Sequence, residues 1–268
     1  MRLDKKIALV TGAGKGIGKE IALGFAAEGA FVIINDLPGT VYSNDVVNEI
    51  TKKGGSAVLY EADISIVGNI RKMFGHIQEK YGQLDVLVNN AGITGWSDFF
   101  NTDEALFDKV MGLNLKGTLF CAIEAAKLMK QNGTGGSIIN ISSICSVLSV
   151  KNLICYSTSK GGIEAMSKQM AVELAPYNIR VNTFGPGPIN TERNLLEDPD
   201  YRQNWGRVVP MKRTGEPQEM IGPAIFLASD ESSYVTGQLF YVDGGWSVQG
   251  KFAEDSLDSQ LQNSAPKD

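Results

Sequence analysis

The chain has 268 residues, a net charge of −5, 43% hydrophobic residues and 21% charged residues. This length accommodates one large α/β domain or two small ones, and the composition is typical of a globular protein. The sequence contains no basic block, no apolar run near the roughly 18 residues of a membrane span and no visible targeting peptide. We therefore expect a cytoplasmic protein whose main partners are neither nucleic acid nor a membrane.

Cysteine and histidine usage argues against several kinds of site. Cys121, Cys145 and Cys155 are odd in number and lack the spacing of metal ligands, as is typical of a reducing compartment. The only histidine, His76, falls in a helical stretch and is expected at the surface. This excludes a Ser-His-Asp hydrolase within one chain and a zinc site built from several histidines. We predict no metal site.

The first predicted strand covers residues 6–11, an apolar run that ends in Gly12-Ala-Gly-Lys-Gly-Ile-Gly18. Apolar residues then recur at helical spacing up to Ala26, and Gly29 closes that helix. A strand, a glycine loop and a helix N-terminus form a cradle for pyrophosphate, because backbone amides point at the anion and glycines let it approach. The spacing differs from the commonest dinucleotide-binding fingerprint, so a purely structural turn is the alternative.

A second predicted strand, residues 31–36, ends in Asp36. An acid at this position accepts hydrogen bonds from the ribose hydroxyls of adenosine and repels a 2′-phosphate, which favours NAD over NADP. Lys15 in the glycine loop is the opposing signal, because a base there can bind that phosphate. We expect the carboxylate to dominate, since it meets the ribose directly, and NAD to be the cofactor.

Two further strands also end in polar residues. After a helix over residues 41–53, the strand at 56–60 leads to Asp63, which could bind the adenine amino group or cap the next helix. After a helix over residues 67–81, the strand at 84–88 stops at Asn89-Asn-Ala-Gly92. Polar amides and a glycine directly after an apolar strand favour a place where the backbone passes close to a flat ligand.

The most reactive side chains lie around the fifth predicted strand, residues 138–141, which follows helices expected at 102–110 and 114–130. Ser143 comes just after this strand, and Tyr156 and Lys160 share one face of the helix expected at 156–176. A cation about 4 Å from a phenol stabilises the phenolate by roughly 4 kcal/mol and lowers its pKa toward neutrality, although burial opposes this change. Such a tyrosine can serve as general acid–base in an alcohol–ketone interconversion, with the serine bonded to the reacting oxygen. The alternative is an ordinary surface turn of helix.

The remaining predicted elements continue the alternation of strands and helices. A strand over residues 178–184 ends in Gly185-Pro-Gly-Pro188, a variable region runs to Arg213, and a helix at 217–228 precedes a last strand at 238–242. Strands that alternate with helices through short loops predict a doubly wound parallel sheet. Such sheets bind ligands beyond the carboxyl ends of their strands, which is where the unusual residues of this chain fall.

Together these motifs resemble those of the classical short-chain dehydrogenases/reductases, over roughly residues 5–247. They are Thr11-Gly-x-x-x-Gly-x-Gly18, Asn89-Asn-Ala-Gly92, Asn114, Ser143, Tyr156-x-x-x-Lys160 and Pro186-Gly187. The resemblance implies an α/β fold with a single Rossmann-type, doubly wound parallel sheet of about seven strands and helices on both faces. It also implies an NAD(P)-binding catalytic domain over residues 1–248, with a substrate lid at about 190–214 and a polar C-terminal tail at 249–268.

The resemblance further implies roles for single residues. Tyr156 is the expected acid–base, and Lys160 is expected to hold the nicotinamide ribose and to lower the pKa of Tyr156. Ser143 is expected to orient the substrate oxygen, and Asn114 to hold a water that links Lys160 to solvent. No catalytic position is substituted, so we expect an active enzyme. The residues expected to bind the cofactor are Gly12, Lys15, Gly16, Ile17, Gly18, Asp36, Asp63, Ile64, Asn90, Ala91, Gly92, Tyr156, Lys160, Pro186, Gly187, Ile189 and Thr191.

The family resemblance also implies a homotetramer or a dimer, and the helix expected from residue 114 supports this independently. Between residues 114 and 129 the charged side chains are Lys116, Glu124 and Lys127, which form one narrow polar stripe. A helix that packs only on its own sheet needs a smaller apolar surface, so the remainder would face a partner subunit. The alternative is a helix buried under its own loops.

The substrate is expected to be a small molecule bound by loops near residues 95–100 and 146–153 and by the lid. The stretch Ile93-Thr-Gly-Trp-Ser97 lacks the Arg-Asp typical of 3-oxoacyl reductases of this family, and Asp243-Gly-Gly-Trp246 resembles aldose 1-dehydrogenase-like members. Indoles pack on sugar rings and arginine pairs with anions, so the candidate contacts, each of which could instead be a rim residue, are Trp96, Arg193, Trp205, Arg207, Lys212 and Arg213.

We therefore expect an NAD-dependent oxidoreductase that transfers a hydride between NAD and a secondary alcohol of a sugar or polyol. One alternative is an NADPH-dependent reductase of 3-oxoacyl thioesters or other ketones. A further alternative is a non-catalytic protein that senses NAD.

Overall fold

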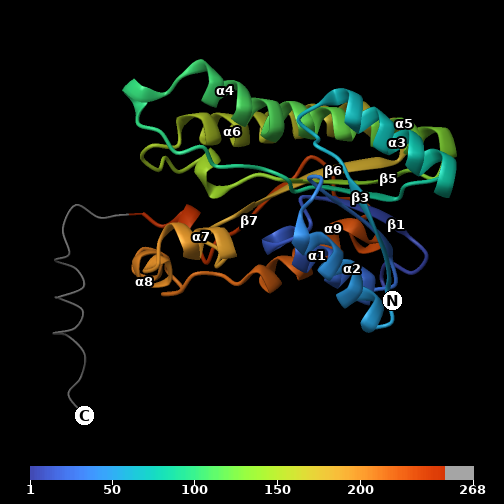
Figure 1. The fold of residues 1–268 in the computed structure, drawn as a ribbon, viewed down its shortest axis with the longest axis horizontal. Helices are drawn as coiled ribbons and strands as arrows, with labels where there is room; N and C mark the ends of the chain where they lie inside the picture. The colour runs from blue at the N-terminus through green and yellow to red at the C-terminus, as the bar shows by residue number, and fades with distance from the viewer. Residues whose placement is uncertain (251–268) are drawn as a thin grey trace, which may run out of the picture.

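Seven short apolar segments form the strands of one parallel sheet in the computed structural model, which describes residues 1–250. The strands are β1 (Ile7–Thr11), β2 (Phe31–Asp36), β3 (Ser56–Glu61), β4 (Val86–Asn89), β5 (Gly136–Ile141), β6 (Ile179–Pro186) and β7 (Leu239–Val242). Their order across the sheet is β3-β2-β1-β4-β5-β6-β7, so the strand order reverses between β1 and β4. The fold is therefore the doubly wound sheet that the sequence predicted (Figure 1).

Helices cover both faces of this sheet (Figure 1). One layer contains α1 (Gly16–Ala27), α2 (Val41–Lys52) and α9 (Ile221–Ala228). The other layer contains α3 (Val67–Tyr81), α4 (Glu104–Met111), α5 (Thr118–Asn132) and α6 (Ile154–Leu174). Two short helices, α7 (Glu192–Glu197) and α8 (Tyr201–Gly206), lie at one end of the sheet in the region predicted as a lid.

The side chains of β1 explain why the sheet needs a helical layer on each face. Ala8 and Val10 belong to the core cluster shared with α1 and α9, whereas Leu9 belongs to the cluster shared with α3 and α5. All three are fully buried. A strand buried on both faces forms a continuous apolar run rather than an alternating one, which is the pattern of this segment.

The helical boundaries differ from the prediction around residue 112. The sequence predicted two separate helices, but α4 continues through a π-helical segment, Gly112–Gly117, directly into α5. Such a segment preserves the run of helical apolar residues, so periodicity alone does not reveal it. The carboxyl ends of β1 and β4, where the strand order reverses, lie next to each other in register and form the crevice edge at which such sheets bind ligands.

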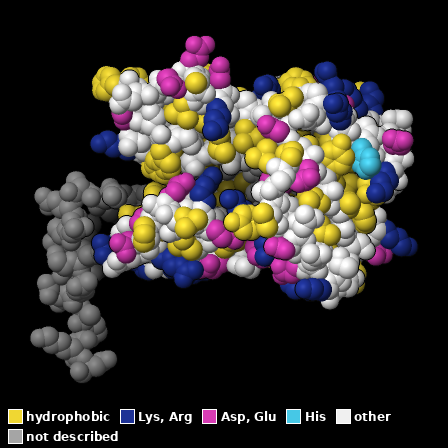
Figure 2. Space-filling view, viewed as in Figure 1, with side chains coloured by type: hydrophobic (Ala, Val, Ile, Leu, Met, Phe, Trp, Pro, Cys, Tyr) yellow, Lys and Arg dark blue, Asp and Glu magenta, His cyan; other side chains and the backbone are white. Residues whose placement is uncertain are grey.

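Positive and negative side chains are mixed on the face of the molecule that Figure 2 shows. His76 is exposed, as predicted, and is visible in Figure 2, where histidine is cyan. On the face shown there, Lys and Arg are interspersed with Asp and Glu. No helix within residues 1–250 combines the length and apolar character needed to cross a membrane. In the same range, no three His, Cys, Asp or Glu side chains come together as metal ligands.

The structure describes all of the helix that was predicted to face a partner subunit, but only the start of the predicted tail. On α5, the apolar side chains of Leu119, Phe120 and Ile123 are partly exposed, and most others are buried. The tail predicted at 249–268 lies, from residue 251 onward, outside the described residues.

Candidate active site

Ser143, Tyr156 and Lys160 meet where β5 ends and α6 begins. Ser143 follows β5 and caps a short 3₁₀ turn, Ile144–Ser146, by accepting a 3.1 Å hydrogen bond from the Cys145 N–H. Tyr156 and Lys160 occupy the first turns of α6, with Lys160 Nζ 5.5 Å from the centroid of the Tyr156 ring. Lys160 is buried, and its Nζ donates a 2.8 Å hydrogen bond to the carbonyl oxygen of Ile141 at the end of β5. The structure thus brings together the three groups that the sequence predicted.

The pKa values in this cluster are governed by burial. Burial lowers the pKa of Lys160 to about 8, with the positive charge of Arg193 acting in the same direction. Burial raises the pKa of Tyr156, whereas hydrogen bonding with Ser143 and the charge of Arg193 lower it. The sequence had predicted that Lys160 lowers the pKa of Tyr156. The direction differs because the phenol is desolvated and the Lys160 ammonium is directed at the Ile141 carbonyl.

Asn114 lies beside this cluster in the π-helical segment, a kind of irregularity that is frequent at functional sites. Its side chain is fully buried and bonds the Ile93 backbone twice, accepting from Ile93 N–H and donating to Ile93 O, each at 2.9 Å. It also donates to Ser159 Oγ at 3.0 Å. A Cβ placed on Gly92 would lie 3.2 Å from Asn114 Oδ1 and 3.6 Å from Lys160 Nζ, so the amide oxygen and the ammonium face the same point of the chain.

The glycine loop joins β1 to α1 and contacts the end of β4. Gly12 has a φ of +62°, and a Cβ there would lie 2.8 Å from the Cα of Ala91, so neither the conformation nor the space suits another residue. Helix α1 begins at Gly16 with Lys15 at its N-cap, and no side chain caps it and no acid occupies its first turn. Its first N–H groups are therefore free to bind an anion.

Asn90 ties this loop to β4. Its Nδ2 donates to the carbonyl oxygens of Thr11 and Gly12 at 2.9 and 3.0 Å. Thr11 Oγ1 in turn accepts from the N–H groups of Asn90 and Ala91 at 3.0 and 3.2 Å. Asn90 therefore lies at the predicted site, next to the glycine loop. Its side-chain nitrogen is used to hold the backbone of that loop.

Asp36 ends β2 next to the glycine loop. One carboxylate oxygen accepts a 2.9 Å hydrogen bond from the Gly14 N–H, and the other accepts a 2.8 Å hydrogen bond from the Leu37 N–H. These amides orient the carboxylate, and each oxygen retains a second lone pair for a ribose hydroxyl. Lys15, the opposing candidate in the loop, is exposed.

The remaining predicted cofactor residues occupy the same edge of the sheet. Asp63 follows β3, and its Oδ1 accepts a 2.8 Å hydrogen bond from the Ser65 N–H in a turn before α3, while Ile64 is buried. Ile189 is also buried, in the core layer of α1. Thr191 caps α7, and its Cγ2 would lie 3.4 Å from a Cβ on Gly16, so the start of the lid lies over the glycine loop.

These residues fit a nicotinamide dinucleotide. An uncapped helix N-terminus suits a pyrophosphate, a carboxylate at the end of β2 suits the adenosine ribose, and the buried ammonium of Lys160 suits the hydroxyls of the second ribose. Strand β6 ends at Pro186, at the same edge of the sheet. The next residue, Gly187, donates a 3.0 Å backbone hydrogen bond to Val242 O of β7.

Some of the predicted substrate contacts lie at the lid or near Tyr156, and others lie away from the catalytic cluster. Trp96 Nε1 donates a 3.1 Å hydrogen bond to Glu197 of the lid, and Trp205 packs edge-on against Trp246 with ring centroids 5.1 Å apart. Arg193 is close enough to Tyr156 for its charge to affect the pKa of that phenol. By contrast, Lys212 and Arg213 line a separate cavity of about 520 Å³, which none of Ser143, Tyr156 and Lys160 line, and Arg207 is exposed.

Sequence reasoning missed four residues around the cluster. Cys145 and Tyr201 lie near enough to Tyr156 to be electrostatically coupled to it. Glu164 forms hydrogen bonds with Ser142 and Ser146, on either side of Ser143, and the Tyr241 ring lies next to Gly185 close to the same turn. The only signal in the sequence was the position of Glu164, one helical turn beyond Lys160 and on the same face.

Comparison with known proteins gives a consistent result. Residues 12–247 match the family described as Enoyl-(Acyl carrier protein) reductase. The chain is 38% identical over 250 residues to an L-rhamnose 1-dehydrogenase (NAD(P)(+)) of Azotobacter vinelandii, covering 91% of this chain and 98% of that one. It is 38% identical over 249 residues to Glucose 1-dehydrogenase 2 of Bacillus subtilis, covering 92% and 96%.

Solved structures of sugar-acid dehydrogenases have the same fold as this chain. A gluconate 5-dehydrogenase from Burkholderia cenocepacia, in complex with NADP and tartrate, has a TM-score of 0.87 and 33% identity, covering 93% of this chain and 98% of that one. A putative gluconate dehydrogenase from Agrobacterium tumefaciens has a TM-score of 0.88 and 35% identity, covering 92% and 98%. With its fold, its motifs and these relatives in agreement, the chain belongs to the short-chain dehydrogenase/reductase family, whose members are NAD(P)-dependent oxidoreductases.

Proposed function

We propose that this protein oxidises a secondary alcohol of a sugar or polyol, with NAD as the hydride acceptor and Tyr156 as the general acid–base. The observation that carries the proposal is the meeting of Ser143, Tyr156 and Lys160 at the sheet edge where the glycine loop and Asp36 also lie. The relatives support the sugar class, since their names are those of rhamnose, glucose and gluconate dehydrogenases.

The chemistry follows from what each side chain offers. Ser143 Oγ bonds the substrate hydroxyl, and Tyr156 Oη in its ionised form accepts the proton of that hydroxyl as the carbon–oxygen double bond forms. A bound NAD supplies the acceptor for the hydride that leaves the same carbon. Lys160 would hold the nicotinamide ribose, and its positive charge would favour the ionised form of Tyr156 against the effect of burial. Asn114, with one lone pair of Oδ1 left over, holds a water beside Lys160 that returns protons to solvent.

NAD rather than NADP is proposed because β2 ends in Asp36, whose carboxylate is fixed by two backbone amides, and an acid at the end of this strand suits the hydroxyls of an adenosine ribose. A 2′-phosphate there would meet a negative charge that has little freedom to move away. The relatives span both cofactors: the Azotobacter enzyme is named for NAD(P)(+), and the Burkholderia structure contains NADP. Lys15 is the residue of this chain that would favour the phosphate.

The second candidate is an NADPH-dependent reductase of oxoacyl thioesters or other ketones, which the description of the matched family favours. The third candidate is a protein that senses NAD without turnover. The buried ammonium of Lys160 beside Tyr156 argues against it, because binding alone does not require an acid–base group. Substrate and cofactor preference separate the first two, and turnover of any substrate excludes the third.

The test is a spectrophotometric screen at 340 nm with NAD and with NADP. Substrates are L-rhamnose, glucose, gluconate, other aldoses, polyols and 2-hydroxy acids in the oxidative direction, and 3-oxoacyl thioesters with NADH or NADPH in the reductive direction. Formation of NADH with a sugar or polyol supports the proposal. Turnover confined to NADPH and thioesters supports the second candidate and contradicts the first.

We also propose how the chain is organised and assembled. Residues 1–248 form the catalytic domain with a lid at about 190–214, and the chain assembles as a homotetramer, or a dimer, through the partly exposed apolar side chains of α5. A cytoplasmic location suits the three free cysteines, Cys121, Cys145 and Cys155. Sedimentation equilibrium gives the assembly directly, and a monomer at micromolar concentration would contradict it.

A further inference from the structure

Glu164 accepts hydrogen bonds from three hydroxyl groups around the turn that carries Ser143. It lies on α6, one turn beyond Lys160. Its Oε1 accepts a 2.7 Å hydrogen bond from Ser142 Oγ, a short one from Ser146 Oγ and a longer one, 3.4 Å, from Tyr241 Oη. None of these four side chains has a part in the proton transfer proposed above.

The two serines bonded to Glu164 stand on either side of Ser143. Ser142 is buried, and its Oγ also lies 3.2 Å from the carbonyl oxygen of Lys160 on α6. Ser146 N–H closes the 3₁₀ turn with a 3.0 Å hydrogen bond to the Ser143 carbonyl, and Ser146 Oγ, which shares its single hydrogen with Glu164, lies 2.6 Å from the same carbonyl. One carboxylate therefore fixes both ends of this turn to the helix that carries Tyr156 and Lys160.

Tyr241 supports the same turn from β7. A Cβ on Gly185 of β6 would lie 2.7 Å from the Tyr241 ring and 3.3 Å from the Ser143 backbone carbon, so only glycine leaves room for the ring there. The ring and the Ser143 backbone thus both lie next to Gly185, and the Tyr241 hydroxyl points to Glu164.

A carboxylate in this place calls for an explanation. Glu164 is partly buried, and within residues 1–250 it forms no ion pair with a lysine or arginine. Withdrawing a carboxylate from water without a counter-charge is unfavourable unless hydrogen bonds compensate, and here all the compensating donors lie around the Ser143 turn.

We propose that Glu164 is a positioning residue, which holds Ser143 Oγ in the place from which it reaches both Tyr156 and the substrate oxygen. The inference rests on the proposed function, in which Ser143 orients that oxygen. Hydrogen-bonding groups that align reacting atoms affect turnover more than binding, because a displacement near 1 Å removes the productive geometry. Glu164 therefore acts on kcat, through Ser143.

The first test compares two variants of Glu164. Glu164→Ala removes all three hydrogen bonds, and we expect kcat to fall by about 10- to 100-fold with KM and the Kd for NADH nearly unchanged. Glu164→Gln retains a carbonyl oxygen that accepts from the same hydroxyls, and we expect it to recover most of kcat. Glu173→Ala, which removes an exposed carboxylate from the same helix, is the matched control.

The second test is a double-mutant cycle with Ser143→Ala. If Glu164 acts through Ser143, Glu164→Ala causes no further loss of kcat once Ser143 is alanine. An equal loss in both backgrounds overturns the positioning role and leaves the proposed function standing. A Ser143→Ala variant with wild-type turnover overturns the role of Ser143 in the proposed function, and the inference with it.

A third variant covers the case in which Glu164→Ala does not fold. Ser146→Ala removes the hydroxyl that Glu164 and the Ser143 carbonyl share. We expect a smaller loss of kcat, about 3- to 10-fold, that again disappears in the Ser143→Ala background. Persistence of that loss without Ser143 contradicts the inference.

Discussion

Lys160 Nζ donates a 2.8 Å hydrogen bond to the carbonyl oxygen of Ile141, the last residue of β5. This bond fastens the first turns of α6 to the strand that leads into Ser143. It uses one of the three N–H groups of the ammonium and leaves two for other acceptors. The same position buries the ammonium, which is why its pKa falls to about 8.

Replacement of Tyr156 by phenylalanine tests the acid–base assignment. Tyr156→Phe keeps the ring but removes the only atom that exchanges the proton. We expect kcat to fall by about 10²- to 10⁴-fold, the range of a general acid–base contribution, with the Kd for NADH within about twofold of wild type. Initial rates and NADH fluorescence titration measure the two quantities. Turnover close to that of wild type would remove Tyr156 from the mechanism.

Lys160 predicts how stability depends on pH. Its pKa is about 8 in the folded protein and 10.5 as an ordinary lysine. Between these values the unfolded chain binds the proton and the folded protein has released it, so this group makes the folded state more stable as pH rises. The gain is about 3 kcal/mol at most across that range.

The measurement is urea unfolding of the wild type and of Lys160→Met at several pH values from 7 to 10. We expect the difference in unfolding free energy between them to shift in favour of the wild type as pH rises from 8. Lys168→Met, which removes an exposed ammonium from the same helix, controls for a lost charge. A pH-independent difference would show that Lys160 keeps an ordinary pKa.

Asp36 predicts the cofactor preference. Asp36→Ala removes the carboxylate that Gly14 and Leu37 hold in place, so the repulsion of a 2′-phosphate and the hydrogen bonds to ribose hydroxyls are lost together. We expect the ratio of kcat/KM for NAD to that for NADP to fall by at least about tenfold, or about 1.4 kcal/mol. Glu61→Ala is the control, because Glu61 is paired with Asp36 in register on β3. An unchanged ratio would contradict the assignment.

The sequence predicted the fold and the edge of the sheet at which the candidate site residues come together, because both depend on local pattern. Apolar runs alternate with helical periodicity, and glycines, acids and amides follow the strands at their carboxyl ends. Parallel strands bring those ends to one edge, so residues as distant as Gly12 and Tyr156 could be placed together without coordinates. Tyr156 and Lys160 also share a helix face by their spacing alone.

Other features depend on tertiary contacts and were beyond prediction. The direction of the pKa change at Tyr156 depends on burial and on the orientation of Lys160 Nζ, neither of which spacing contains. Asn90 was expected to bind the cofactor, and the hydrogen bonds of its side-chain nitrogen to two backbone carbonyls of the glycine loop could not be read from the sequence. Glu164 was visible at the next helical turn, but its partners come from β5, the following turn and β7.

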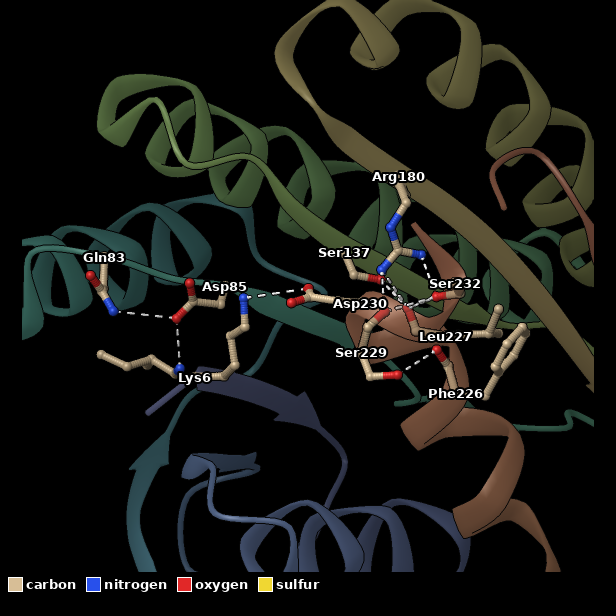
Figure 3. Close-up of polar contacts among 11 residues, drawn as sticks. Lys6, Gln83, Asp85, Ser137, Arg180, Phe226, Leu227, Ser229, Asp230 and Ser232 are labelled. Atoms are coloured by element: carbon tan, nitrogen blue, oxygen red, sulfur yellow. Dashed lines mark hydrogen bonds and ion pairs between the residues drawn. The ribbon is translucent and has the colours of Figure 1, made fainter. Parts of the chain in front are cut away.

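Arg180 predicts a stability effect far from the active site. It lies near the amino end of β6, at the edge of the sheet opposite the cofactor crevice, and its guanidinium caps the carboxyl end of α9 (Figure 3). It donates to the carbonyl oxygens of Leu227 and Ser229 at 2.9 and 3.1 Å and to Ser232 Oγ at 2.7 Å. Burial lowers its pKa, so the charge is stabilised mainly by these acceptors.

Arg180→Met keeps the apolar part of the side chain and removes every donor, which leaves the final carbonyls of α9 with fewer partners. We expect the free energy of unfolding to fall by about 2–3 kcal/mol, because three hydrogen bonds are lost and each has a net contribution of about 0.5–1.5 kcal/mol. Lys6→Met is the matched control: Lys6 pairs with exposed Asp230 at 3.8 Å in the same cluster, and we expect a loss below about 1 kcal/mol (Figure 3). Chemical denaturation measures both. At temperatures where both variants remain folded, kcat should equal that of the wild type, and a comparable loss in the two variants would show that Arg180 contributes only a surface charge.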